Sequence, residues 1–236
     1  MRIAPFAIVL AGCVESRVPV KPLPELVVDG TPTSEAPVAE IHMFPGERMI
    51  WDVSLDGMSL GRAELVVGAA DVHSEFRTAS LVGALVSVHH DLTTVLDGDQ
   101  VASATDVLEV DGDVTRTGYA RTPGVPPVHT LHSVVGWLRA WAPQATRNGF
   151  VTVAHAGHLY RLDVARPYRD DLPSGAALRV ECRASRVDPL PAGAHASPPV
   201  TLTLWLGVER AMAPVRIQAN DGSNRILAEL IDYHRE

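Results

Sequence analysis

Apolar and polar residues alternate along most of the chain beyond residue 42. In the segment ERMIWDVSL, Met49, Trp51, Val53 and Leu55 fall on one face, and the residues between them are mostly polar. Such alternation is typical of a β-strand with one buried face. About a dozen segments of this kind follow one another, which predicts a mostly antiparallel sheet of about a dozen short strands.

Asp-Gly pairs separate several of these segments, at Asp56-Gly57, Asp97-Gly98, Asp111-Gly112 and Asp221-Gly222. An Asp-Gly pair between two alternating segments is a strong hairpin signal. The pairs Asp97/Asp99 and Asp111/Asp113 also resemble the start of a calcium loop. The further oxygen ligands that such a loop needs at fixed offsets are missing, so we interpret both segments as hairpin turns.

One segment departs from alternation. HTLHSVVGWLRAWAP places apolar residues at helical spacing and ends at Pro143, which predicts one helix over about residues 130–142. A single helix among many strands favours a mostly β fold, either a strongly curved antiparallel sheet or a β-barrel-like domain with the helix packed on it.

The N-terminal segment has the order of an export signal. Arg2 precedes an apolar run over residues 3–10, and two small residues then precede Cys13. The segment Leu-Ala-Gly-Cys resembles a bacterial lipobox, in which the cysteine is acylated and becomes the mature N-terminus. We therefore expect a lipoprotein signal peptide at residues 1–12 and lipidation of Cys13. The alternative is a plain apolar N-terminus with a buried cysteine.

The residue after Cys13 is Val14, and not the aspartate that retains enterobacterial lipoproteins in the inner membrane. This resemblance implies a lipid-anchored protein of the outer membrane that faces the periplasm. Five prolines follow before residue 41, and proline has no amide hydrogen for a helix or a central strand. We interpret residues 13–41 as a tether and residues 42–236 as one β domain. The second cysteine, Cys182, lies in an alternating stretch, which predicts a buried free thiol.

Charge and motif content narrow the function classes. The formal net charge of −8 argues against a nucleic-acid partner. The sequence contains no serine nucleophile elbow, Walker loop, dinucleotide glycine pattern or zinc-protease helix. We therefore expect no catalytic residues, no cofactor and a protein that is not an enzyme.

Two histidine pairs are candidate metal ligands, His129 with His132 and His155 with His158. A zinc site needs three or four converging ligands. We interpret these residues as separate, exposed histidines at the start of the helix and at a hairpin tip, and we expect no metal site. The neighbours His89 and His90 would point to opposite faces of a strand. A hydrolase with a histidine-based site remains a remote alternative.

Three stretches together resemble the bacterial family called domain of unknown function 3108, over about residues 42–236. The first is the segment from residue 44 to residue 67, the second is the helix that carries Arg139, and the third is LTLWLGVERAMAPVRIQAND. Glu209 stands where the family usually has aspartate. The matched positions are Phe44, Gly46, Glu47, Trp51, Gly57, Gly61, Arg139, Trp205, Leu206, Glu209, Pro214, Val215 and Arg216. The resemblance implies an exported, mostly lipoprotein or periplasmic protein with a strongly curved antiparallel β architecture, and it implies no established activity.

The remaining candidate residues are four tryptophans, which could bind a ligand, and a group of charged residues. Trp51 and Trp205 lie on predicted strands and Trp137 and Trp141 share one face of the predicted helix. These four side chains could line a cavity for an apolar ligand, or they could simply fill the core. We also expect Glu47, Glu209 and Arg216 to form a structural charge cluster if their strands are neighbours.

Two functions remain open from the sequence. In the first, a lipid-anchored β domain binds an amphipathic or apolar envelope molecule, such as a lipid, without catalysis. In the second, the chain is a structural or adaptor lipoprotein that contacts an envelope protein through its outer surface.

Overall fold

The structure is a computed structural model that describes residues 34–35, 40–79, 83, 86–122, 128–188 and 198–236. The expected signal peptide, Cys13 and nearly all of the expected tether lie outside the described residues. The described part of the β domain contains one sheet and one α-helix, called α3.

The sheet has fourteen strands in the spatial order β1-β8-β9-β11-β12-β13-β14-β2-β3-β4-β5-β6-β7, and β10 pairs with β11 beside this path. The strands are β1 (Ser34–Glu35), β2 (Glu47–Leu55), β3 (Met58–Val67), β4 (Asp71–Thr78), β5 (Val88–Asp97), β6 (Gln100–Val110), β7 (Asp113–Ala120), β8 (Gly149–His155), β9 (His158–Val164), β10 (Tyr168–Leu172), β11 (Gly175–Arg186), β12 (Val200–Gly207), β13 (Ala213–Asn220) and β14 (Arg225–Arg235). Apart from the two-residue β1, which runs parallel to β8, the pairings between these strands are antiparallel.

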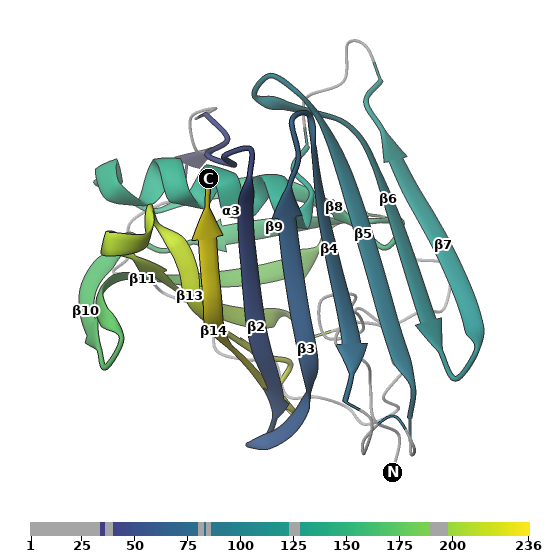
Figure 1. Cartoon of the computed structure of the whole chain (residues 1–236). Helices are drawn as coiled ribbons and strands as arrows, with labels where there is room; N and C mark the ends of the chain where they lie inside the picture. Colours follow the sequence, from purple (N-terminus) through teal and green to yellow (C-terminus); the bar gives the residue numbers. More distant parts are fainter. Residues whose placement is uncertain (1–33, 36–39, 80–82, 84–85, 123–127, 189–197) are drawn as a thin grey trace.

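The sheet is strongly curved and nearly closes into a barrel. Figure 1 shows β2 to β7 as a row of long strands, with β9, β11 and the helix crossing behind them. The first and last long strands, β2 and β14, pair along almost their whole length, so the two ends of the domain meet in the middle of the sheet. This architecture confirms the predicted mostly β, barrel-like fold with one packed helix.

Hairpin turns occur at the predicted Asp-Gly pairs. Asp56-Gly57 joins β2 to β3 and Asp111-Gly112 joins β6 to β7, and both residues of each pair have positive φ. Two successive positive φ angles match the right-handed twist of a two-residue hairpin and suit Asp-Gly. Ala156-Gly157 makes the same turn between β8 and β9, with φ angles of 49° and 77°. The two aspartate pairs considered as calcium loops are therefore parts of hairpins.

Helix α3 spans Leu131–Trp141, within two residues of the predicted bounds. It begins with a capping box, in which Thr130 accepts from the backbone of Ser133 and Ser133 accepts from the backbone of Thr130. Pro143 lies in the short 3₁₀ helix Ala142–Gln144 that follows. Trp137 and Trp141 stack with ring centroids 5.0 Å apart, as their shared helix face predicts.

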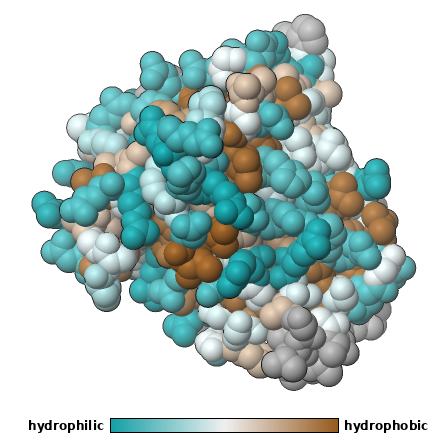
Figure 2. Space-filling view, in the orientation of Figure 1, coloured by the Kyte–Doolittle hydropathy of each residue, from teal (hydrophilic) through white to brown (hydrophobic). Residues whose placement is uncertain are grey.

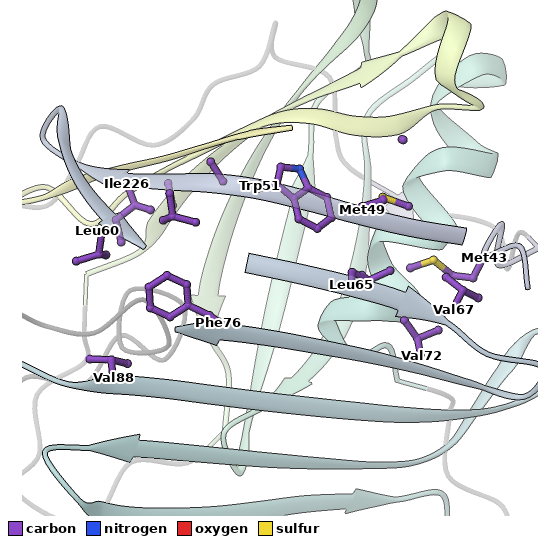
Figure 3. Packing of buried hydrophobic residues seen from close by; sticks show 14 of the residues in the cluster. Met43, Met49, Trp51, Leu60, Leu65, Val67, Val72, Phe76, Val88 and Ile226 are labelled. Carbon is purple, nitrogen blue, oxygen red and sulfur yellow. The ribbon is translucent and has the colours of Figure 1, made fainter. Parts of the chain in front are cut away.

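Buried apolar residues form two main clusters inside the curve of the sheet. One lies against β2 to β4, and Figure 3 shows Met49, Trp51, Leu65 and Phe76 within it. The other packs α3 against β8, β9, β11 and β12. It includes Cys182, whose free thiol is buried as predicted, and burial raises the pKa of that thiol.

A fully buried ion pair joins the start of the sheet to the helix. Arg139 on α3 donates two hydrogen bonds to Glu47 on β2, with N–O distances of 2.7 and 2.6 Å. The Glu47 carboxylate also accepts from the Tyr233 hydroxyl at 2.8 Å, and the guanidinium also donates to the Ala211 carbonyl at 3.0 Å. Such a bidentate pair has the geometry that best offsets the cost of removing two charges from water.

We expect Arg139→Met to destabilise the domain by about 3–5 kcal/mol, because it leaves the Glu47 carboxylate buried without a counter-charge. The double variant Glu47→Gln/Arg139→Met removes both charges and should recover a large part of this loss. Urea unfolding of the three proteins measures the difference. Equal stability of the single and double variants would show that the pairing of the two charges is unimportant.

Candidate functional site

A cluster of titratable side chains lies where the β8–β9 hairpin reaches the concave face of β5 to β7. His90 on β5 and Asp106 on β6 point into the curve of the sheet, and His155 ends β8 directly opposite them. The hairpin tip also approaches β7, since a Cβ atom at Gly157 would lie 3.5 Å from Thr117. The two halves of the curved sheet therefore meet at this point, which we call the seam.

Asp106 lies between the two imidazoles. His90 Nε2 is 2.8 Å from Asp106 Oδ1, and His155 Nδ1 is 3.0 Å from Asp106 Oδ2. The exposed fractions of the side chains are 9% for His90, 10% for Asp106 and 2% for His155. Burial by itself raises the pKa of Asp106, but the two imidazoles outweigh burial and hold it well below its usual range. The carboxylate is therefore ionised.

Among the described residues, none is a hydrogen-bond partner of the distal nitrogen of His155. His155 Nε2 is buried and unpaired, and the 3.0 Å contact of Nδ1 with Asp106 Oδ2 is close but is not aligned as a hydrogen bond. A buried polar atom without a partner is unfavourable by about 1–3 kcal/mol. In a native structure such an atom calls for an explanation, and a bound molecule is one.

A pocket of about 120 Å³ opens beside this histidine. It has room for about four water molecules, at roughly 30 Å³ each. Its wall is mostly apolar, and its polar groups come from Asp106 and His155 of the seam cluster, from β7 and from His158 on β9. The lining residues are Leu92, Ala104, Asp106, Thr117, Gly118, Tyr119, Ala154, His155, Ala156, Gly157, His158 and Leu159.

A second polar network holds the start of the helix on the sheet. His132 Nδ1 lies 3.0 Å from Thr94 Oγ1 on β5, and His132 Nε2 lies 2.8 Å from Ser74 Oγ on β4. Thr94 also contacts the helix cap residue Thr130 at 3.0 Å. Burial lowers the pKa of His132 to about 3, helped by the nearby imidazoles of His73 and His90. This histidine is therefore neutral in the folded protein near pH 7.

The four tryptophans are buried in three separate clusters, as the core-filling alternative described. Trp51 donates to the Pro214 carbonyl at 2.8 Å, and Trp205 donates to Asp170 Oδ2 at 2.8 Å. The Trp205 ring also contacts the guanidinium carbons of Arg179 and Arg216, at 5.3 and 5.2 Å. None of the four side chains lines the seam pocket.

The expected cluster of Glu47, Glu209 and Arg216 is not formed. Glu47 pairs with Arg139, whereas Arg216 lies 3.7 Å from Glu229 on the neighbouring strand. Glu209 lies on the exposed 3₁₀ turn Val208–Arg210. The reason is topological, because β14 lies between β13 and β2 and supplies the partner of Arg216 itself.

The histidine predictions were partly wrong. His89 and His90 do point to opposite faces, since His89 pairs with Glu75 and His90 with Asp106. His132 and His155, however, are buried and were expected to be exposed. The signal that could have revealed the seam was Asp106, a carboxylate that stands on the inward face of the alternating strand QVASATDVLEV.

In the described residues, no group of three or more His, Cys, Asp or Glu side chains is arranged to hold a metal ion. No helix within the same residues has the length and hydrophobicity needed to cross a bilayer.

Acid should destabilise the protein through His132. In the unfolded chain this histidine is protonated below about pH 6.5, whereas in the folded protein it resists protonation down to about pH 3. The unfolded state therefore binds more protons between these values, so stability falls as the pH falls through this range.

The expected contribution of His132 is a loss of about 2 kcal/mol between pH 7 and pH 5. Urea unfolding at both pH values should show this loss reduced by about that amount in His132→Gln. The control His234→Gln, at an exposed position of β14, should lose as much stability as the wild type. Equal losses in all three proteins would contradict the assignment.

Comparison with known proteins supports the fold. The chain matches no protein-family model and no curated protein sequence. The structure is similar to a β-barrel-like protein of domain of unknown function 1849 from Brucella abortus, with a TM-score of 0.54 and 13% identity over 80% of this chain and 97% of that chain. A match to the lipoprotein LppX of Mycobacterium tuberculosis has a TM-score of 0.32 and 11% identity over 81% of this chain and 88% of that chain. At these identities, the first likeness shows a shared barrel-like fold and nothing finer.

Proposed function

We propose that this chain is a lipid-anchored envelope protein whose β domain binds a small amphipathic envelope molecule, without catalysis, in the seam pocket. The observation that carries the proposal is the pocket itself, which has a mostly apolar wall and is lined by His155, a buried side chain whose Nε2 has no hydrogen-bond partner among the described residues. Apolar walls with a few well-placed polar groups are the usual composition of a small-molecule site.

We place the ligand site at the seam because side chains already fill the space between the sheet and the helix. Trp51, Trp137 and Trp141 are 5% exposed or less, and they pack against apolar neighbours. A pocket of about 120 Å³ is far smaller than a drug-sized site of roughly 300–1,000 Å³. We therefore place only the head of the amphiphile, and a short part of its chain, in the pocket.

The anchor is the part of the proposal that comes from the sequence alone. The lipobox-like segment ending at Cys13, the proline-rich stretch after it and Val14 are the observations for a lipoprotein on the periplasmic side of the outer membrane. Membership of the family called domain of unknown function 3108 belongs to the same proposal. Acyl chains on Cys13 would hold the β domain near the lipids from which its ligand comes.

A second candidate function is that of an adaptor, and the free edge of β7 favours it. In the described residues, β7 is the last strand of the sheet and pairs only with β6. An unpaired edge can accept an extended segment of another protein. Figure 2 shows that the viewed face is mostly polar, with apolar residues in small separate patches, so an adaptor would use backbone pairing more than a broad apolar surface.

We propose no hydrolase activity, because among the described residues no hydroxyl or thiol side chain hydrogen-bonds His155. A catalytic histidine of that class activates a hydroxyl or thiol within hydrogen-bond reach. Among the described side chains, none hydrogen-bonds His155 Nε2.

Filling the pocket should abolish ligand binding. Ala104→Phe places a ring in the pocket, whereas Ala102→Phe makes the same change two residues away on β6, at a position that does not line it. After incubation with vesicles of total bacterial lipid, native mass spectrometry of the full chain should detect an added mass on the wild type and Ala102→Phe, and none on Ala104→Phe. An unmodified mass for the wild type would reject the binding function and favour the adaptor.

Cys13→Ser should abolish lipidation and release the protein from the membrane fraction, because the serine hydroxyl replaces the thiol that is acylated. Labelling with a radioactive or clickable fatty acid, followed by membrane fractionation, measures both effects. The matched variant Cys182→Ser keeps Cys13 and should stay labelled. A wild-type protein that takes up no label would contradict the lipoprotein assignment.

A further inference from the structure

We infer that the free edge of β7 pairs with β7 of a second copy of this chain, in an antiparallel ladder whose twofold axis passes through Thr117. Two curved sheets are thereby joined edge to edge. The edge named above for an adaptor then has one occupant, a second copy. Such a dimer goes beyond the proposed binding function, which a monomer can perform.

Alternate residues of β7 direct their backbone groups away from the sheet. The backbone N–H of Arg121 donates to the Ala102 carbonyl at 3.0 Å, which continues the unbroken register between β6 and β7. Because hydrogen-bonded and non-hydrogen-bonded positions alternate in an antiparallel pair, every second residue before Arg121 also bonds β6. In Figure 1, no described strand lies on the outer side of β7. The residues that face away from β6 are all exposed, and they are Val114, Arg116, Gly118 and Ala120.

The edge of β7 lacks most of the devices with which natural proteins prevent pairing. Such devices include prolines, lysines, β-bulges and a covering segment. The strand DVTRTGYA contains no proline and no lysine, and its register with β6 has no bulge. The opposite edge is covered, because β1 pairs with Gly149 and Phe150 of β8, and His129 pairs with Val153. Within the described residues, the edge of β7 is therefore the one that a further strand can extend.

One register suits the pairing of two identical strands. Residues that face outward can hydrogen-bond only with residues that face outward, so the twofold axis must pass through a residue. An axis at Arg116 sets two guanidiniums directly opposite each other, which is destabilising. An axis at Thr117 sets Arg116 opposite Gly118, where no side chain opposes it. Val114 then lies opposite Ala120. Axes nearer either end of the strand leave fewer residues paired.

The same register brings opposite charges together at both ends of the ladder. Asp113 lies opposite the Arg121 position of the second copy, and opposite charges directly across two strands are favourable. Arg121 donates to Asp97 at 3.0 Å and to Gln100 at 2.7 Å, but a guanidinium has five donors and can also bind a second carboxylate. Since Thr117 lines the seam pocket, the two pockets of the dimer lie on either side of the axis.

Disulfide crosslinking tests the register. Val114→Cys and Ala120→Cys are made separately in a full chain that also carries Cys13→Ser, so that the other thiol is the buried Cys182. Cα atoms of a hydrogen-bonded antiparallel pair lie about 5.5 Å apart, within disulfide reach. The two variants, mixed under reducing conditions and then oxidised, should therefore crosslink. Either variant alone should not, because its two cysteines lie six residues apart along the ladder, about 20 Å. Crosslinking that is absent from the mixture, or equally strong in either variant alone, would overturn the inference.

Sedimentation velocity tests the pairing itself, on the full chain with Cys13→Ser at about 100 µM, where a micromolar dissociation constant gives mostly dimer. Arg116→Pro removes an outward N–H without breaking a hydrogen bond to β6, so this variant should be monomeric. The matched variant Arg116→Ala keeps the N–H and should remain a dimer. Asp113→Arg sets like charges opposite each other and should weaken the dimer at least tenfold, and Asp113→Arg/Arg121→Asp should restore part of this loss.

A monomeric parent chain in this experiment would overturn the inference and leave the edge to a different protein. A dimer that persists in Arg116→Pro would also overturn it, because association would then use another surface. Thermal melting monitored by circular dichroism identifies a variant that does not fold, and the crosslinking result then decides. Failure of the dimer leaves the proposed binding function in place, since the added mass on the wild type measures that function separately.

Discussion

The buried pair of Glu47 and Arg139 is the interaction on which the arrangement of the domain depends. Its two charges cannot be left in the core alone, so β2, the helix, the turn at Ala211 and Tyr233 must come together in one way. This constraint positions one end of α3. At the other end, the segment before the helix pairs with β8, since His129 exchanges backbone hydrogen bonds with Thr152 and Ala154. The ion pair therefore helps to place the β8–β9 hairpin, and with it the seam.

The concave face of β4 to β6 carries polar groups that need partners from both α3 and the β8–β9 hairpin. Ser74, Thr94, His90 and Asp106 point inward from these strands, and burying such groups without partners is unfavourable. His132 from the helix and His155 from the hairpin supply the partners. The contacts of His132 and His155 join residues far apart in the sequence, so together they specify how the curved sheet closes. Within the described residues, His155 Nε2 has no hydrogen-bond partner, and the His155 side chain lines the pocket.

Local sequence patterns predicted the strands, the hairpins and the helix. They failed to predict side-chain partners and burial that depend on residues far away in the sequence. Alternation in ERMIWDVSL and the Asp-Gly turns act over a few residues, so the strands, the hairpins and the single helix could be predicted. The partner of Glu47 lies 92 residues away on the helix, and no local pattern indicates it. His132 and His155 stand at the start of a helix and next to a hairpin turn, positions that usually face water, and only the closing of the sheet buries them. The seam pocket was for this reason invisible from the sequence, although His155 itself had been singled out.

The pairing of β2 with β14 also governs when the sheet can form during synthesis. Residues 47–55 lie against residues 226–235, so the middle of the sheet joins two segments that are synthesised far apart in time. Contacts of such large sequence separation form slowly, because a long loop must close before they contribute any stability. A nascent chain therefore cannot complete the middle of its sheet until β14 has been synthesised.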